Sequence, residues 1–197
     1  MQKSNIFIIS GPSGAGEDSI IEGLRSYLSL QRIITTTTRQ MRPGEAQGEP
    51  YYFISEEEFE AGLKIGNFAE HAKQYNGNFY GVTKSELQRV QNSGKIGLWK
   101  IEYKGVISVK KMYPEIISIF LNAPSLEILE NRIRRRSNVS NEYVAERMLY
   151  TKEWLKHLDI YDYIVINEEG KLIEAVKEVA EIIRKNANLE NKISLSV

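Results

Sequence analysis

A glycine-rich stretch near the N-terminus constrains the fold of this chain more than any other segment. The short apolar run 6–9 leads into Gly11, Gly14 and Gly16, and residues 17–24 then carry apolar side chains at helical spacing. This order predicts a buried parallel strand, a glycine loop and a helix. Glycines permit positive φ and close backbone approach, so successive N–H groups can surround a phosphate, and the helix start adds a partial positive charge.

The spacing of this loop fits the phosphate-binding pattern G-x-x-x-x-G-K-[ST], but its last two positions do not. Gly11 and Gly16 are correctly spaced, whereas Glu17 and Asp18 stand where the pattern has Lys and Ser or Thr. A carboxylate therefore replaces the cation that would neutralise a phosphate. Acidic side chains in the first turn of a helix are also favourable without any phosphate, by about 0.3–1 kcal/mol through the helix dipole. The loop alone leaves both interpretations open.

Composition narrows the classes of protein and of metal site. The 197 residues include 26 basic and 26 acidic side chains, and this zero net charge argues against general binding to nucleic acid or anionic membranes. With no cysteine and two histidines, disulfides, thiolate metal sites and histidine-rich sites are excluded, whereas oxygen-ligated magnesium stays open. The first strand starts within about five residues of the N-terminus and no apolar run approaches the ~20 residues of a membrane span, so we expect a cytoplasmic protein.

Residues 36–82 are expected to form a small mixed lobe. A strand at 32–36 precedes a polar loop rich in glycine and proline, and a second short strand follows at 51–54. The capping-box pattern at 55–58 opens a helix. The segment 68–82 contains an Asn-Gly turn between two apolar runs, which predicts a hairpin.

The remaining chain alternates between helices and strands. Helices are expected at 84–91, from 106 onward, at 125–135, through Val144, Met148 and Trp154, and at 171–185, with strands at 96–101, 116–121 and 163–166. We therefore predict an α/β fold in which a parallel sheet has helices on both faces, an inserted lobe and a closing helical segment. The predicted boundaries are 1–35 and 84–185 for the core, about 125–157 within it for the helical lid, 36–83 for the inserted lobe, and 186–197 for a polar tail.

Several further segments match one enzyme family in order and spacing. They are TTTTRQMRPGE, YYFIS followed by EEEF, NFAEHA, GNFYGVTKSEL, ENRIRRR and YDYIVIN. With these segments and the glycine loop, the chain resembles guanylate kinases over nearly its whole length. Each segment alone is weak evidence for the family, whereas the segments together are specific evidence for it. The resemblance implies a P-loop-type sheet with a GMP-binding lobe and a lid, and ATP-dependent phosphorylation of GMP and dGMP to the diphosphate in purine nucleotide metabolism.

The inserted lobe carries candidate residues for the phosphate acceptor. Arg39 and Arg42 lie three residues apart in a glycine-proline loop, where two guanidinium groups can hold a phosphate, or can simply be solvated. Glu70 lies among apolar neighbours and could accept two N–H groups from guanine, which adenine does not supply, or it could be an ordinary edge-strand charge. The resemblance implies a GMP site of Thr35, Arg39, Arg42, Glu45, Tyr51, Glu70, Tyr80 and Glu102. Val82 stands where the family usually has a hydroxyl side chain.

Arginines of the expected lid could stabilise the transferring phosphoryl group. A run of arginines is also typical of a solvated helix face. The resemblance selects Arg132, Arg136 and Arg147 as catalytic, and leaves Arg134 and Arg135 as surface residues. It also implies an ATP site of Gly11, Ser13, Gly14, Ala15, Gly16, Glu17, Asp18 and Asn167, with Asn167 at the adenine.

A second departure from the family lies near residue 100. The family has acidic residues at this strand end, and here Lys100 and Glu102 occupy the two positions. Because the strand end and the glycine loop are neighbours in such a sheet, both charge reversals fall at one site. We infer a compensated swap, in which Lys100 pairs with Glu17 and reaches phosphate, and Asp18 becomes a magnesium ligand. Independent decay after loss of activity is the alternative.

The expected function is therefore that of an enzyme with ATP as phosphoryl donor and Mg²⁺ as metal ion. Its partners would be GMP and ATP, with no nucleic acid and no membrane, and the protein would be a monomer or homodimer. Two alternatives stay open from the sequence. One is a catalytically impaired guanylate-kinase-like module that binds nucleotide or protein, and the other is a kinase with a changed nucleotide acceptor.

Overall fold

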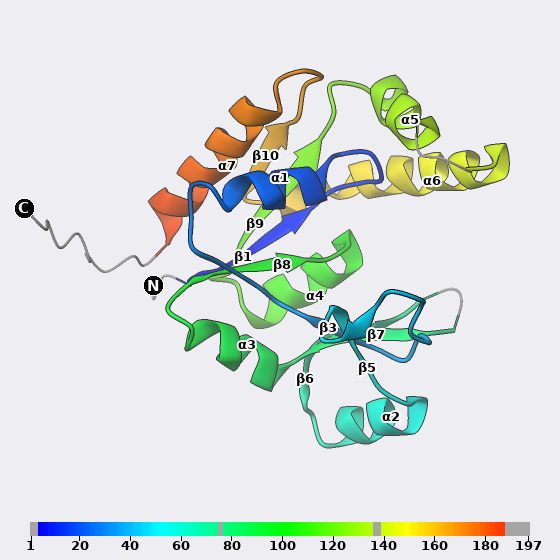
Figure 1. Cartoon of the computed structure of the whole chain (residues 1–197), viewed down its shortest axis with the longest axis vertical. Coiled ribbons are helices and arrows are strands. Elements are labelled where there is room, and N and C mark those ends of the chain that lie inside the picture. Colours follow the sequence, from blue (N-terminus) through cyan, green and yellow to red (C-terminus); the bar gives the residue numbers. More distant parts are fainter. Residues whose placement is uncertain (1–3, 75–76, 136–138, 188–197) are drawn as a thin grey trace, which may run out of the picture.

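A five-stranded parallel sheet forms the centre of the molecule (Figure 1). The computed structural model describes residues 4–74, 77–135 and 139–187. The strands lie in the order β10-β9-β1-β8-β2, and every neighbouring pair is parallel. Their bounds are β1 Ile6–Ser10, β2 Leu30–Arg32, β8 Ile96–Lys100, β9 Ile117–Asn122 and β10 Tyr163–Ile166. This arrangement confirms the predicted α/β class.

Helices cover both faces of this sheet, because β1 presents apolar side chains to each side. Phe7 and Ile9 pack with buried residues of α1 and α7, whereas Ile6 and Ile8 pack with those of α3 and α4. Figure 1 shows these two pairs of helices on opposite sides of the strands. All of β1 is buried, as expected for a strand with a continuous apolar run. The helices are α1 Glu17–Leu24, α3 Lys84–Gln91, α4 Tyr103–Met112 and α7 Leu172–Asn186.

A second five-stranded sheet lies within residues 35–83, in the order β4-β5-β3-β7-β6. Its elements are β3 Thr35–Thr37, β4 Ala46–Gln47, β5 Pro50–Phe53, α2 Glu56–Lys64, β6 Phe68–Lys73 and β7 Phe79–Thr83. The predicted capping box is present, with both Ser55 and Glu58 bonded across the start of α2. Phe59 of α2 stacks on Phe68 at 4.2 Å and on Phe79 at 5.1 Å between ring centroids. Helix α2 therefore covers one face of the second sheet.

A pair of helices follows β9 on the far side of the molecule from α2 (Figure 1). These are α5 Leu126–Arg134 and α6 Asn141–Trp154, and the 3₁₀ helix η1 Leu155–Ile160 follows α6 directly. Buried Ile133, Val144 and Met148 form a small cluster between α5 and α6, apart from the two main clusters. Across the described ranges, no helix is both long enough and apolar enough to cross a membrane.

The structure differs from the sequence prediction at the passage between the two sheets. The single strand predicted at 32–36 is two strands, because β2 pairs in the parallel sheet and β3 in the second sheet. Glu86 of α3 accepts a hydrogen bond from Ile34 N at 2.8 Å, which takes that N–H out of any strand ladder. Arg89 binds the same carboxylate and also donates to Arg32 O at 3.2 Å.

Two smaller differences concern the start of one helix and an additional short strand. Helix α4 begins at Tyr103, three residues before the predicted start, because Glu102 has an extended backbone and forms the N-cap. The exposed two-residue strand β4 was not predicted. The hairpin of β6 and β7 is antiparallel as expected, while residues 75 and 76 of its predicted turn lie outside the described residues.

Candidate active site

The glycine loop joins β1 to α1 in a conformation that requires glycine at two positions. Gly14 and Gly16 have φ of +92° and +94°, which side chains rarely adopt. A Cβ at Gly14 would lie 2.9 Å from Leu129 O, and one at Gly16 would lie 2.4 Å from Asn167 Nδ2. Backbone strain and lack of space thus both exclude larger residues. Helix α1 starts without a side-chain cap, so the loop holds the helix N-terminus open to an anion.

Two of the predicted site residues hold the loop from behind. Arg132 of α5 donates to Gly14 O at 3.2 Å and to Asn167 O at 2.8 Å. The amide of Asn167, at the end of β10, donates to Ala15 O at 2.9 Å and is 6% exposed. Two of these bonds use carbonyl oxygens of the loop, those of Gly14 and Ala15, and the Ala15 N–H is bonded to Pro12 O at 3.0 Å within the loop itself. The loop is therefore fixed by two elements that are far away in sequence.

Lys100 lies beside the acidic start of α1. Strand β8 is the neighbour of β1, with Lys100 in register with Ile9. The ammonium group donates to both carboxylate oxygens of Asp18 at 2.9 Å and lies 4.0 Å from Glu17 Oε2. The predicted closeness of Lys100 to Glu17 is confirmed, and the shorter contact of Lys100 is with Asp18. The side chain of Asp18 is 78% exposed and projects toward the strand end, whereas that of Glu17 is 15% exposed.

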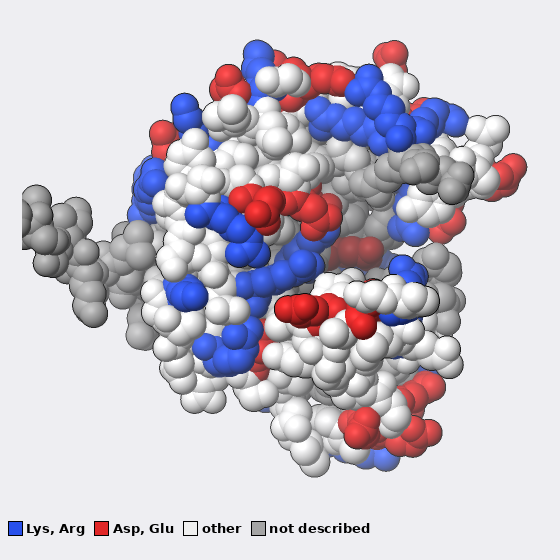
Figure 2. Space-filling view, in the orientation of Figure 1, with Lys and Arg blue, Asp and Glu red and all other residues white. Residues whose placement is uncertain are grey.

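One face of the second sheet collects the predicted acceptor residues. The register pairs Thr35 with Tyr51, and it pairs Glu70 with Val82, two residues from Tyr80 on β7. Since side chains alternate along a strand and cross-strand partners share a face, these four polar side chains lie on one face of the sheet. This is the face opposite α2. Figure 2 shows a recess between the part of the molecule that carries α1 and the part that carries the second sheet, with basic and acidic side chains along it.

Glu45 organises the two arginines of the acceptor loop. Arg39 Nη2 donates to Glu45 Oε1 at 2.8 Å, and Arg42 N donates to Glu45 Oε2 at 2.8 Å. The Arg39 guanidinium also lies over the rings of Tyr51 and Phe53, at 5.4 and 5.3 Å. Hydrogen bonding from Arg39 lowers the pKa of Glu45, and the carboxylate in turn raises the pKa of Arg39. Arg39 is therefore held charged and oriented before any ligand arrives.

Glu70 is a buried carboxyl group at the end of the acceptor face next to α4. It is 8% exposed, and a Cβ at Gly105 of α4 would lie 3.2 Å from its Oε1. Burial, with a smaller effect from the charge of Glu102, raises the pKa of Glu70 to about 7. A carboxyl group poised in this way can accept N–H groups from a base, and it favours a ligand that supplies them.

Tyr150 is a site residue that the sequence analysis missed. Its hydroxyl donates to Glu102 Oε2 at 2.7 Å, which ties α6 to the start of α4. Burial and the Glu102 carboxylate raise the pKa of Tyr150 above its usual range. The only local sequence signal for Tyr150 is its position three residues after Arg147, which places both side chains on one face of α6. Arg147 lies over the Tyr143 ring at 5.1 Å, and its buried Nε has no hydrogen-bond partner within the described ranges.

The other predicted residues divide into surface, core and undescribed positions. Arg134 binds Glu130 and Asn141, and Arg135 binds Glu169, so both are surface arginines as predicted. Val82 is fully buried in the core cluster that contains Trp99 and Val106. Arg136 lies outside the described residues. Ser13 belongs to the loop, at an intermediate exposure.

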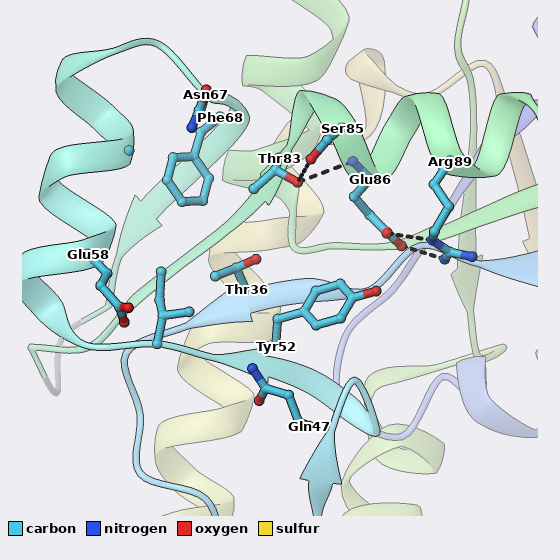
Figure 3. A pocket seen from close by; sticks show the side chains of 12 residues that line it. Thr36, Gln47, Tyr52, Glu58, Asn67, Phe68, Thr83, Ser85, Glu86 and Arg89 are labelled. Atoms are coloured by element: carbon cyan, nitrogen blue, oxygen red, sulfur yellow. Dashed lines mark hydrogen bonds and ion pairs between the residues drawn. The ribbon is translucent and has the colours of Figure 1, made fainter.

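A separate cavity of about 500 Å³ lies on the other face of the second sheet (Figure 3). Thr36 and Tyr52 line it, and they alternate with Thr35 and Tyr51 of the acceptor face. Glu86 and Arg89 of α3 close one end, joined by the ion pair drawn in Figure 3. This cavity is therefore not the acceptor site.

Comparison with known proteins assigns this geometry to a family. Residues 3–186 match the sequence model of the guanylate kinase family. The chain belongs to the guanylate kinase family. The guanylate kinase of Idiomarina loihiensis is 40% identical over 84% of this chain and 80% of its own length, and that of Haemophilus influenzae is 36% identical over 93% and 89%. The crystal structure of guanylate kinase from Anaplasma phagocytophilum has a TM-score of 0.68 and 28% identity, covering 93% of this chain and 86% of that one.

Membership of the guanylate kinase family confirms the resemblance seen in the sequence and the expected class of phosphotransferase. The fold of the solved relative also confirms the α/β architecture with a parallel sheet and flanking helices. The roles of individual residues in this chain stay predictions.

Proposed function

We propose that this protein transfers the terminal phosphoryl group of ATP to GMP, giving ADP and GDP. One observation carries the proposal: the anion loop and the acceptor face meet at the end of β8. There Lys100 contacts the loop, and Glu102 lies within electrostatic reach of Glu70. A donor on the loop and an acceptor on the second sheet would then face each other across the same strand end.

The acceptor side of the proposal rests on paired and oriented charges. Arg39 and Arg42 would hold the phosphate of GMP, helped by the hydroxyls of Tyr51 and Tyr80. Ionised Glu70 would accept the N–H groups of guanine, and adenine offers no equivalent pair. The full acceptor set is Thr35, Arg39, Arg42, Glu45, Tyr51, Glu70, Tyr80 and Glu102. None of these residues is assigned to the 2′ position of the ribose, so dGMP is included as an acceptor.

On the donor side, the loop N–H groups would hold ATP phosphates and Asn167 would lie at the adenine. Arg132, Arg136 and Arg147 would stabilise the charge of the transferring group. A phosphate oxygen of GMP attacks the terminal phosphorus in line, the bond to the bridging oxygen of ATP breaks, and ADP leaves with that electron pair. Catalysis is positioning and charge neutralisation, without a covalent intermediate.

Magnesium fits this donor site through few protein ligands. The described residues contain no group of three or more histidines, cysteines and acids that could hold a metal ion. Mg²⁺ commonly binds through one or two carboxylates, water and substrate phosphates, and Asp18 would supply the protein carboxylate. When bound, the ion would neutralise phosphate charge.

The proposal keeps the predicted division of the chain, with 1–35 and 84–185 as the core, 125–157 as the lid and 36–83 as the GMP-binding lobe. A cytoplasmic location and a monomer or homodimer belong to the same proposal.

The test is a coupled assay of ADP release with GMP, dGMP, AMP, CMP and UMP as acceptors, with the product identified by phosphorus NMR. We expect GDP from GMP, and a kcat/KM for AMP lower by at least about 100-fold, because unpaired buried groups penalise the wrong base. Binding of GMP without ADP release would instead indicate a nucleotide-binding module. Faster turnover of another monophosphate would indicate a changed acceptor.

A further inference from the structure

We propose that Lys100 is the catalytic cation of the donor site, and that it exchanges Asp18 for the donor phosphates when ATP binds. It would do from β8 what a lysine at position 17 does in the ordinary phosphate loop. This inference rests on the proposed function, because it assumes that ATP is the donor at the loop.

The loop needs a cation that it does not contain. Residues 11–18 include no lysine or arginine, and Glu17 and Asp18 add two negative charges where a polyphosphate would lie. The two carboxylates and the polyphosphate would repel each other strongly in a site that is partly shielded from water. The partial positive charge of the helix start is only about half an elementary charge, which is too small to offset two carboxylates and a phosphate chain.

Two basic groups near the loop or α1 have partners other than Glu17 and Asp18. Arg132 donates to the carbonyl oxygens of Gly14 and Asn167, so it holds the loop from behind. Arg25 pairs with Glu22 just after the end of α1, away from the loop. Lys100 is the cation that the structure pairs with the acidic pair, at 2.9 Å from Asp18 and 4.0 Å from Glu17.

The contact between Lys100 and Asp18 has the properties of a pair that exchanges partners. Its two side chains are 30% and 78% exposed, and exposed ion pairs contribute little to stability. The lysine ammonium has three donors on a flexible stem, so it can turn from a carboxylate to phosphate oxygens without a backbone change. Each phosphate oxygen gained would replace a carboxylate oxygen lost. Asp18 would then be available to hold a metal ion bound with ATP.

The charge swap predicts that the effects of the two single substitutions on ligand binding do not sum to the effect of the double substitution. Glu17→Lys alone would place two lysines together and remove a carboxylate that lies beside Lys100. Lys100→Asp alone would leave three carboxylates at the loop. The double variant Glu17→Lys/Lys100→Asp restores a cation in the loop and an acid at the strand end, so it should recover what each single variant loses.

The decisive experiment is calorimetry of a non-hydrolysable ATP analogue and, separately, of GMP. The variants are Lys100→Met, Lys100→Arg, the two singles and the double above, with Lys95→Met as matched control at the opposite end of β8. We expect Lys100→Met to weaken the analogue by about 30-fold or more and to leave GMP within about twofold. Lys100→Arg should stay within about tenfold of the wild type, because it keeps the charge. Lys95→Met should match the wild type for both ligands.

Two results would overturn the inference: unchanged analogue binding in Lys100→Met, or singles whose effects simply add in the double variant. Thermal melts identify any variant that has failed to fold, and Lys100→Arg and the double variant then still decide the question. Failure here is separable from failure of the proposed function. A wild type that phosphorylates GMP while Lys100→Met binds the analogue normally contradicts only the role of Lys100. A wild type without GMP-dependent ADP release contradicts the proposed function, and the binding of the analogue still tests Lys100.

Discussion

The acceptor face and the donor loop obtain their charges in opposite ways. On the acceptor side, Arg39 and Glu45 are six residues apart and pair within one loop. On the donor side, Lys100 reaches Asp18 from 82 residues away, on a neighbouring strand. The first arrangement can be read from a short sequence window. The second can be recognised only when the topology of the sheet is known, because the sheet is what brings the two residues together.

The two ion pairs also differ in how firmly they are held. The side chains of Arg39 and Glu45 are 11% and 17% exposed, and the pair is reinforced by aromatic rings and a backbone N–H. The pair of Lys100 and Asp18 is open to water and joins two flexible side chains. The acceptor loop is therefore expected to be preformed, whereas the donor-site pair is expected to rearrange when ATP binds. Substitutions in the two sites distinguish these behaviours.

The largest effect is expected at Arg132. Arg132→Ala removes the bonds to Gly14 O and Asn167 O together with one arginine of the lid, so kcat should fall by about 100- to 1,000-fold. Affinity for GMP, measured by calorimetry, should be unchanged because the acceptor face is not touched. A rise in the KM for ATP at constant kcat would show that Arg132 only anchors the loop.

Glu70→Gln should act on the acceptor alone. An amide in place of the carboxylate can accept at one position only, so GMP should bind about 100-fold more weakly while the ATP analogue is unaffected. Calorimetry with GMP and AMP measures the change in base preference. Equal affinities of the wild type for GMP and AMP would remove Glu70 from base recognition.

The effect of pH on GMP binding should be smaller than the effect of Glu70→Gln, and it should depend on the Glu70 carboxyl group. Its pKa of about 7 means that lowering the pH from 8 to 6 protonates the group, so GMP affinity should fall by roughly tenfold in this interval. GMP titrations at these two pH values measure the change, and Glu70→Gln serves as the control that lacks this component.

The same shift has an opposite consequence for folding. Because the folded pKa lies above its ordinary value of 4.5, burial favours the protonated form and stability falls as pH rises toward 7. Urea unfolding of the wild type and of Glu70→Gln would reveal the slope. A pH slope that is identical in the two proteins would contradict the assignment to Glu70.

The smallest effect is expected at Arg134, which pairs with Glu130 on the surface of α5. Arg134→Ala should change kcat by less than about threefold and the free energy of unfolding by less than about 1 kcal/mol. Steady-state kinetics and urea unfolding check both. A large loss of kcat would show that the lid arginines had been assigned incorrectly.

Most of the fold could be predicted because its signals are local. Helix α3 and strand β10 begin and end where the pattern placed them, and the Ser55 capping box fixes the start of α2. The break between β2 and β3 could not be predicted. The residues there favour strand throughout, and the interruption comes from Glu86, 52 positions away from Ile34.

The candidate site shows the same limit. Arg39, Arg42 and Glu45 lie in one loop and could be singled out from the sequence, and the structure adds the hydrogen bonds from Arg39 and Arg42 N to Glu45. Tyr150 was missed since its partner Glu102 is 48 residues away. The sequence also placed Lys100 near the loop, but the choice of Asp18 over Glu17 depends on which side chain faces solvent, and no sequence pattern reports this.

The Glu86 carboxylate has a mechanical consequence. The chain passes from the parallel sheet to the second sheet at Ile34 and returns through α3, and Glu86 fastens the outgoing segment to the returning one. The same carboxylate therefore holds together the two chain segments that lead into and out of the second sheet. The Ile34 amide, although it lies in a connection, should then exchange its hydrogen as slowly as an amide of a central strand.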